Sequence, residues 1–122
     1  MAWRKFDKYI QVVYNMDIRI LPETLAFEWD GGNNEKNFLK HGLSNKECED
    51  VFGVNEFLLL KDQAHSTIED RYLVIGPNKL NKILVLAITL RGTRVRIISG
   101  RPASKKERIF YEKTFKTPKI QK

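Results

Sequence analysis

Apolar and polar residues alternate along several stretches of the chain, as they do in a β-strand with one buried face. In the stretch Arg94-Val95-Arg96-Ile97, the valine and the isoleucine would share one face and the two arginines the other. Comparable patterns predict five strands, at residues 25–29, 56–61, 70–76, 82–90 and 93–100. Short turns separate the last three, so the run from residue 56 onward is predicted to form an antiparallel meander.

Helical spacing and helix-end signals predict three helices around these strands. The first would cover about residues 34–41 and end at Gly42, since glycine suits the left-handed position after a helix. Ser44 would begin the second, which runs to about residue 52. The last would cover about residues 103–115, where Ser104 and Glu107 have the spacing of a capping box. The predicted fold class is α+β, a small antiparallel sheet of about four to five strands packed against helices.

The first 24 residues are predicted to be an extension of this fold. Trp3, Phe6, Ile10 and Val13 recur at helical spacing, which predicts an amphipathic helix. Two interpretations are open: a helix that docks onto a partner, or a segment that covers apolar surface of the protein itself. The predicted organisation is an extension at residues 1–24, a single domain at residues 25–117 and a loose basic tail at residues 118–122.

Composition narrows the class of protein. The longest apolar run, residues 83–88, is far shorter than the ~20 residues that span a membrane. The N-terminal residues hold charges among their aromatics and do not resemble a secretory signal. A single cysteine, Cys48, excludes an internal disulfide framework and fits a reducing cytoplasm, where the protein is predicted to reside. Cys48 shares a helical face with Val51 and Phe52, so it is predicted to be a core residue.

The positive charge is concentrated in the last quarter of the chain. The net charge is +7, yet residues 91–122 hold eleven basic and two acidic residues, while residues 1–90 hold eleven basic and thirteen acidic ones. This asymmetry indicates a polyanionic partner, either nucleic acid or an acidic protein. Six of the basic residues surround the junction between the last strand and the last helix: Arg94, Arg96, Arg101, Lys105, Lys106 and Arg108. An anion-binding junction and an ordinary strand edge followed by a solvated basic helix are both open interpretations.

The chemistry that these residues could support is metal-free. His41 and His65 are 24 residues apart and belong to no ligand motif, and no glycine-rich phosphate loop is present, so no metal or cofactor is predicted. Metal-free RNA cleavage needs a proton acceptor for the 2′-hydroxyl, cations around the phosphorane and a proton donor for the leaving oxygen. His41 is the natural proton-transfer candidate, although a histidine favoured by the helix dipole explains it equally well. Arg71, at a strand start, could point to solvent or into a cleft.

Several short motifs follow one another along the chain in an informative order. They are Trp29-Asp30, Asn37, Lys40-His41-Gly42, residues 71–76 (Arg-Tyr-Leu-Val-Ile-Gly), residues 89–92 (Thr-Leu-Arg-Gly), residues 96–101 (Arg-Ile-Ile-Ser-Gly-Arg), and Ala103-Ser104 with Glu107, Arg108 and Tyr111. In this order and spacing they resemble the BrnT family, the ribonuclease toxins of a bacterial type II toxin–antitoxin system. The resemblance covers about residues 27–111.

The resemblance implies a RelE-like fold, RNA cleavage that inhibits translation, and neutralisation by a BrnA-like antitoxin that is a DNA-binding repressor. It implies a dimer or heterotetramer with that antitoxin. By the same resemblance, His41, Arg71, Arg96 and Arg101 would line the cleavage site, while the phosphates would be held by Lys40, Arg94, Lys105, Lys106 and Arg108. The acid and the base are not assigned.

One departure from the family pattern bears on activity. The family usually has a lysine at the position of Asn33. If that lysine contacts RNA, its replacement favours an alternative function, a catalytically inert protein that binds RNA or an antitoxin without cleaving.

Overall fold

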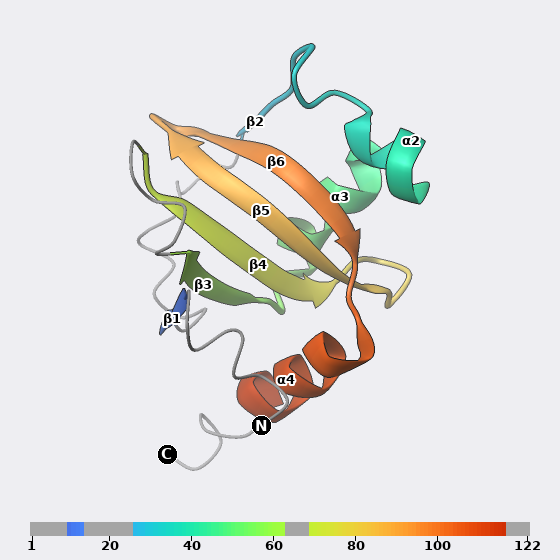
Figure 1. Cartoon of the computed structure of the whole chain (residues 1–122), viewed down its shortest axis with the longest axis vertical. Coiled ribbons are helices and arrows are strands. Elements are labelled where there is room, and N and C mark those ends of the chain that lie inside the picture. Colours follow the sequence, from blue (N-terminus) through green and yellow to red (C-terminus); the bar gives the residue numbers. More distant parts are fainter. Residues whose placement is uncertain (1–9, 14–25, 63–68, 117–122) are drawn as a thin grey trace.

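The computed structural model describes residues 10–13, 26–62 and 69–116 (Figure 1). Strands and helices follow one another as β1 (Ile10–Val13), β2 (Ala26–Glu28), α2 (Lys36–His41), α3 (Asn45–Val54), β3 (Leu58–Asp62), β4 (Arg71–Pro77), β5 (Ile83–Arg91), β6 (Arg94–Pro102) and α4 (Lys105–Lys116). The sheet and the helices together make an α+β fold, as predicted. None of the described helices is long and apolar enough to cross a membrane.

The sheet has six strands in the order β1-β3-β4-β5-β6-β2. Its centre, β3 to β6, is the predicted antiparallel meander. Two edge strands extend it: β1 pairs antiparallel with β3, and β2 pairs parallel with β6. The sheet is therefore mixed and slightly larger than predicted, because hydrophobic periodicity does not reveal which distant segment pairs with an edge.

The helix predicted at the N-terminus is wrong where the structure describes it. Residues Ile10–Val13 form strand β1. Three of these four residues are β-branched, which favours a strand, and β3 offers them an edge to pair with. Trp3 and Phe6, the other members of the predicted apolar stripe, lie outside the described residues, as do His65 and the predicted tail at 118–122.

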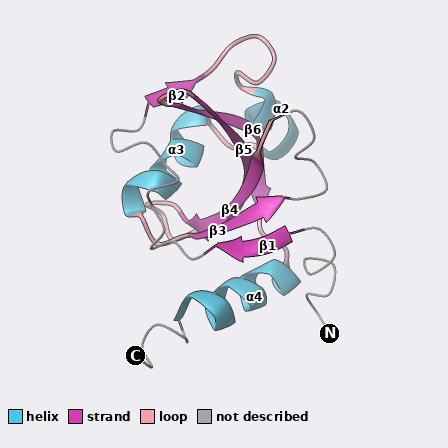
Figure 2. Ribbon diagram, turned by 90° about the vertical axis from the view of Figure 1, so that its left-hand side faces the viewer, coloured by secondary structure: helices cyan, strands magenta, loops and turns pink. Residues whose placement is uncertain are grey.

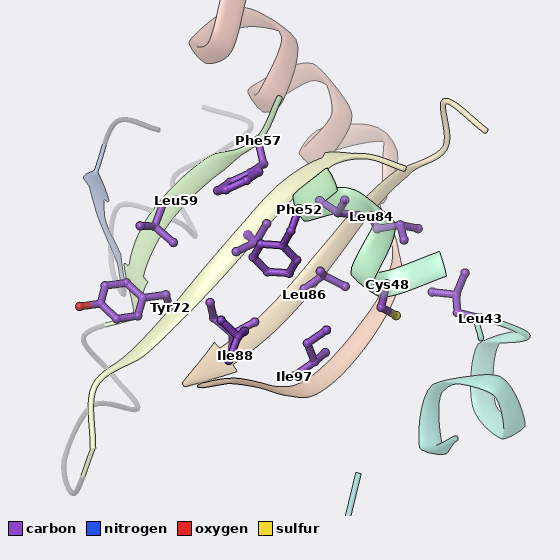
Figure 3. Close-up of a cluster of buried hydrophobic side chains, with 13 residues drawn as sticks. Leu43, Cys48, Phe52, Phe57, Leu59, Tyr72, Leu84, Leu86, Ile88 and Ile97 are labelled. Carbon is purple, nitrogen blue, oxygen red and sulfur yellow. The ribbon is translucent and has the colours of Figure 1, made fainter. Parts of the chain in front are cut away.

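One hydrophobic core lies between the sheet and α3 (Figure 3). Cys48, Val51 and Phe52 of α3 are buried there, which confirms Cys48 as a core residue. The ring of Phe52 lies 5.4 Å from that of Phe27 and 5.4 Å from that of Phe57. Alternate sheet residues complete this core: Leu59, Tyr72, Val74, Leu84, Leu86, Ile88, Val95 and Ile97.

A second core lies on the opposite face of the sheet, under α4 (Figure 2). Phe110 and Tyr111 of α4 pack there against residues of β3, β4 and β5, among them Ile75 and Val85. The Tyr111 hydroxyl donates to the carbonyl oxygen of Glu56, and burial raises the pKa of Tyr111 to about 12. Among the described helices, α4 lies towards one end of this face, and much of the face of β4, β5 and β6 remains in view beyond it (Figure 1).

The predicted helix ends are confirmed. Gly42 follows α2 with φ +73°. Ser44 caps α3 in a reciprocal capping box with Glu47. At α4 the Ser104 N–H donates to Glu107 Oε1 at 2.8 Å, and the Glu107 N–H donates to Ser104 Oγ at 3.2 Å. These caps satisfy N–H groups that have no partner inside the helix and so fix where each helix begins.

Candidate active site

Three polar residues form a row across neighbouring strands on the sheet face that carries α4. Arg71 of β4 lies opposite Thr89 of β5, and Thr89 lies opposite Arg96 of β6. They share the face of Ile75 and Val85 because residues two apart in a strand point the same way. Directly opposed side chains have Cβ atoms about 5 Å apart, so the arginines stand on either side of Thr89. We call these three residues the arginine row.

Arg96 is held by a bidentate ion pair with Asp30. Its Nη1 lies 2.7 Å from Asp30 Oδ2, and its Nη2 lies 3.1 Å from Asp30 Oδ1. The Arg96 side chain is 14% exposed and that of Asp30 is 52% exposed. The hydrogen bond from Arg96, followed by that from the Gly32 N–H, lowers the pKa of Asp30, and the same pair raises the pKa of Arg96. Both groups are therefore ionised at neutral pH.

The turn that carries Asp30 is attached to β6 by Asn33. The side-chain amide of Asn33 donates to the carbonyl oxygens of Glu28 and Ile97, both at 2.9 Å, and its oxygen accepts from the Asp30 N–H at 2.8 Å. Asn33 is 1% exposed. The position at which the family resemblance leads one to expect a lysine is thus a buried, fully hydrogen-bonded junction between β2, the turn and β6.

Further ion pairs surround the arginine row. Arg91 lies 3.4 Å from Glu69 and 3.7 Å from Glu28, each measured between a guanidinium nitrogen and a carboxylate oxygen. The pKa of Glu69 is lowered, with Arg91 as the largest cause and Thr89 as the second largest. Thr89 is fully buried, and its hydroxyl makes no hydrogen bond of standard geometry with the described residues. Arg94, opposite Arg91, is exposed. The arginine row is therefore surrounded by both positively and negatively charged side chains.

Arg101 lies at the other end of β6 from Arg96. Five residues along a strand span roughly 16 Å, so the structure does not bring Arg101 together with Arg71 and Arg96. It forms its own bidentate pair with Glu107, with both N–O distances at 2.7 Å. Burial raises the pKa of Glu107, but Arg101 and the Ser104 N–H outweigh it and leave the pKa lowered. This pair joins the end of β6 to the start of α4.

The other predicted phosphate-binding residues lie on exposed helix surfaces. Lys105, Lys106 and Arg108 lie in the first turn of α4, where Arg108 Nη1 donates to the Ala103 carbonyl oxygen at 3.1 Å. Lys40 and His41 end α2, which contacts β6. Figure 1 places α2 beside β6, and α4 beyond the end of that strand.

One protein family matches more than half of this chain. Residues 29–107 match the model of a family described as the ribonuclease toxin, BrnT, of type II toxin–antitoxin systems. The chain belongs to the BrnT family. The match begins at Trp29 and ends at Glu107, and so it includes the arginine row and both bidentate pairs. The comparison with curated proteins gave no match. Membership of a type II family implies an RNA target and an antitoxin partner.

The candidate site contains residues that the sequence patterns did not mark as functional. Thr89 and Asp30 belong to motifs that carry the family resemblance, but neither was assigned to the site. Thr89 could have been found from the two-residue Gly92-Thr93 turn, because that turn places Thr89 opposite Arg96. The Asp30 pairing had no local signal, since the two partners are 66 residues apart. Among the described residues, no three His, Cys, Asp or Glu side chains gather in a way that could hold a metal ion.

Proposed function

We propose that this chain is an endoribonuclease toxin that cleaves RNA without a metal ion, inhibits translation in the cytoplasm, and is neutralised by a BrnA-like antitoxin. Family membership supports the ribonuclease class, and the arginine row supports the site. In the row, Arg71 and Arg96 are two strand spacings apart, about 10 Å. One phosphodiester between the two arginine side chains would then lie within reach of both guanidinium groups, each of which binds phosphate oxygens at about 2.8 Å.

The proposed reaction uses the RNA's own 2′-hydroxyl as the nucleophile. A base takes the 2′-hydroxyl proton, a bond forms between the 2′-oxygen and phosphorus, and the bond from phosphorus to the 5′-oxygen breaks. The departing 5′-oxygen takes a proton from an acid, so the products carry a 2′,3′-cyclic phosphate and a 5′-hydroxyl. Arg71 and Arg96 would stabilise the charge on the phosphorane.

Proton transfer needs a group other than the arginines, because guanidinium groups do not lose their proton in proteins. His41 is our candidate for this role, since an imidazole ring can accept a proton at one nitrogen and donate one from the other, and α2 contacts β6. Lys40, Arg94, Lys105, Lys106 and Arg108 would hold neighbouring phosphates of the same strand. Arg101, roughly 16 Å from Arg96 along β6, fits this phosphate-binding role better than a place at the reacting phosphate.

The antitoxin is the second proposed partner. We propose a complex with a BrnA-like protein, as a dimer or heterotetramer. The basic surface around β6 and α4 suits an acidic protein segment as well as RNA, so the antitoxin would compete with the substrate for it.

A catalytically inert protein is the alternative function. The observation that favours it is that Arg96 and Arg101 are each already paired with a carboxylate, which reduces the net positive charge offered to a phosphate. Such a protein would bind RNA or an antitoxin through the same surface without turnover.

Cleavage of a long RNA by the purified protein in excess chelator separates the two functions. We expect chelator-resistant cleavage that leaves 2′,3′-cyclic phosphate ends. An Arg71→Ala/Arg96→Ala variant should lose this activity, while Lys82→Ala, which removes a charge near Glu47 of α3, should retain it. If folded wild-type protein leaves RNA intact, both alone and with ribosomes, the nuclease proposal fails and the inert function is favoured.

A further inference from the structure

We infer that Asp30 is a positioning residue, whose carboxylate fixes the guanidinium of Arg96 in the orientation that meets the substrate phosphate at the arginine row. This inference rests on the proposed nuclease function and deepens it. Asp30 itself touches neither the phosphate nor the reacting atoms, and it acts through Arg96.

Asp30 is well placed to hold another side chain because its own carboxylate is held. Oδ1 accepts hydrogen bonds from the Gly32 N–H at 2.8 Å and from Arg96 Nη2 at 3.1 Å. Oδ2 accepts from Arg96 Nη1 at 2.7 Å. The backbone N–H of Asp30 donates to Asn33, whose amide donates to the carbonyl of Ile97, the residue next to Arg96. The turn and the strand beneath the guanidinium are therefore tied to each other.

The pair leaves Arg96 able to bind an anion. Asp30 occupies donors on Nη1 and Nη2, and a guanidinium has further N–H donors, including that of Nε. A free arginine has many rotamers, and a bidentate carboxylate removes most of them before the substrate arrives. Orientation before binding accelerates the chemical step because the guanidinium need not reorganise when charge develops on the phosphate.

A role in stability alone does not explain Asp30. A second acid among the described residues that pairs with an arginine through both oxygens, Glu107, is buried and also caps α4, so it supports the fold directly. The Asp30 side chain is 52% exposed, and exposed ion pairs contribute little to stability. A carboxylate beside a phosphate site also repels RNA. The arrangement therefore weakens substrate binding, and orientation of Arg96 is the gain that offsets this loss.

This trade-off gives the inference a distinctive kinetic signature. Asp30→Asn keeps the size of the side chain and an acceptor for the Gly32 N–H, but it removes the charge and the second acceptor. We expect the single-turnover cleavage rate to fall by about 10-fold or more, as for a lost transition-state contact. Affinity for a 2′-O-methyl RNA, which has no free 2′-hydroxyl and cannot be cleaved, should stay equal or rise. Asp50→Asn on α3, which removes the same charge on the opposite side of the sheet, should change neither quantity by more than about twofold.

A second variant displaces Arg96 without changing any charge. A Cβ added at Gly32 would lie 3.0 Å from Arg96 Nη2 and 3.3 Å from Asp30 Oδ1, and so would crowd the ion pair itself, whereas one added at Gly31 would meet no atom within 4 Å. Gly32→Ala should therefore slow cleavage while leaving RNA affinity unchanged, and Gly31→Ala should behave as wild type. If the Asp30→Asn variant cleaves RNA as fast as wild type or faster, Asp30 does not orient Arg96 for cleavage, and the inference is overturned. A parallel loss of cleavage, affinity and thermal stability would also overturn it.

Arginine side-chain NMR tests the orientation independently of activity. Rotation about the Nε–Cζ bond of Arg96 should be slow in the wild-type protein and faster in Asp30→Asn. If the wild type does not cleave RNA at all, the proposed function fails, and this measurement still decides the inference: an unchanged rotation rate in Asp30→Asn would overturn it.

Discussion

The side-chain amide of Asn33 donates a hydrogen bond of 2.9 Å to the carbonyl oxygen of Ile97, a residue 64 positions later in the chain. This contact joins the turn after β2 to the strand that carries Arg96. Asn33 therefore has a structural role, at the position where the family resemblance leads one to expect a lysine.

Replacement of Asn33 should destabilise the protein. Asn33→Asp removes two donors and places a carboxylate against two carbonyl oxygens in a site that is 1% exposed. We expect a loss of about 2–4 kcal/mol in the free energy of unfolding, measured by urea denaturation. The adjacent Asn34 is exposed, so Asn34→Asp should cost less than about 0.5 kcal/mol. Equal stability of the two variants would show that the Asn33 hydrogen bonds do not hold the turn.

Arginine, and not merely positive charge, should be required at position 96. Arg96→Lys keeps the charge but cannot make two parallel hydrogen bonds to Asp30 and also bind phosphate. We expect kcat/KM for RNA cleavage to fall roughly 100-fold with circular dichroism unchanged. Lys46→Arg, an exchange between the same two residue types on α3, should change kcat/KM by less than about threefold. A fully active Arg96→Lys enzyme would remove bidentate recognition from the proposed mechanism.

Glu107 should make stability depend on pH. Its pKa is lowered in the folded protein from the ordinary value of 4.5, because Arg101 and the Ser104 N–H outweigh burial. The stabilisation is therefore present above about pH 4.5 and is lost as the pH falls through the native pKa. Wild type should exceed Glu107→Gln in Tm at about pH 7, and the difference should shrink towards about pH 3. A constant difference across this range would exclude ionised Glu107 as its source.

Two glycines should respond oppositely to alanine. A Cβ at Gly76 of β4 would lie 2.6 Å from Phe57 Cβ and 2.8 Å from Phe57 Cα, so Gly76→Ala must displace backbone. We expect it to lower the free energy of unfolding by about 2–3 kcal/mol. At Gly53 of α3 a Cβ would meet nothing within 4 Å, so Gly53→Ala should stabilise by about 0.5–1 kcal/mol through helix propensity. Thermal melts of both variants beside wild type check this pair.

Much of the fold followed from local patterns. Alternation placed Val95 and Ile97 in the core and Arg94 and Arg96 on the opposite face, and the Ser104–Glu107 spacing marked the start of α4. These signals are local because strand and helix periods are properties of neighbouring residues. They also gave the meander, since short turns leave consecutive strands little choice of partner.

The site was less accessible to the same reasoning, because its parts come from distant segments. The parallel pairing of β2 with β6 and the Asp30–Arg96 contact join the two ends of the domain, and no residue pattern specifies such partners. Arg101 was grouped with Arg96 through the family resemblance, and the strand was predicted to end at residue 100, whereas β6 continues to Pro102. The strand's length separates them, and Arg101 serves the start of α4 through Glu107.

The pairing of β2 with β6 has a consequence for the timing of activity during synthesis. The turn holding Asp30 and Asn33 is made early, whereas Arg96 and Ile97 follow more than sixty residues later. A nascent chain that ends before β6 contains Arg71 and Thr89, but it lacks Arg96 and the Ile97 carbonyl oxygen that bind the turn. Closing so long a loop is also among the slower steps of folding. The candidate site would thus be complete only after β6 has been made and has paired with β2.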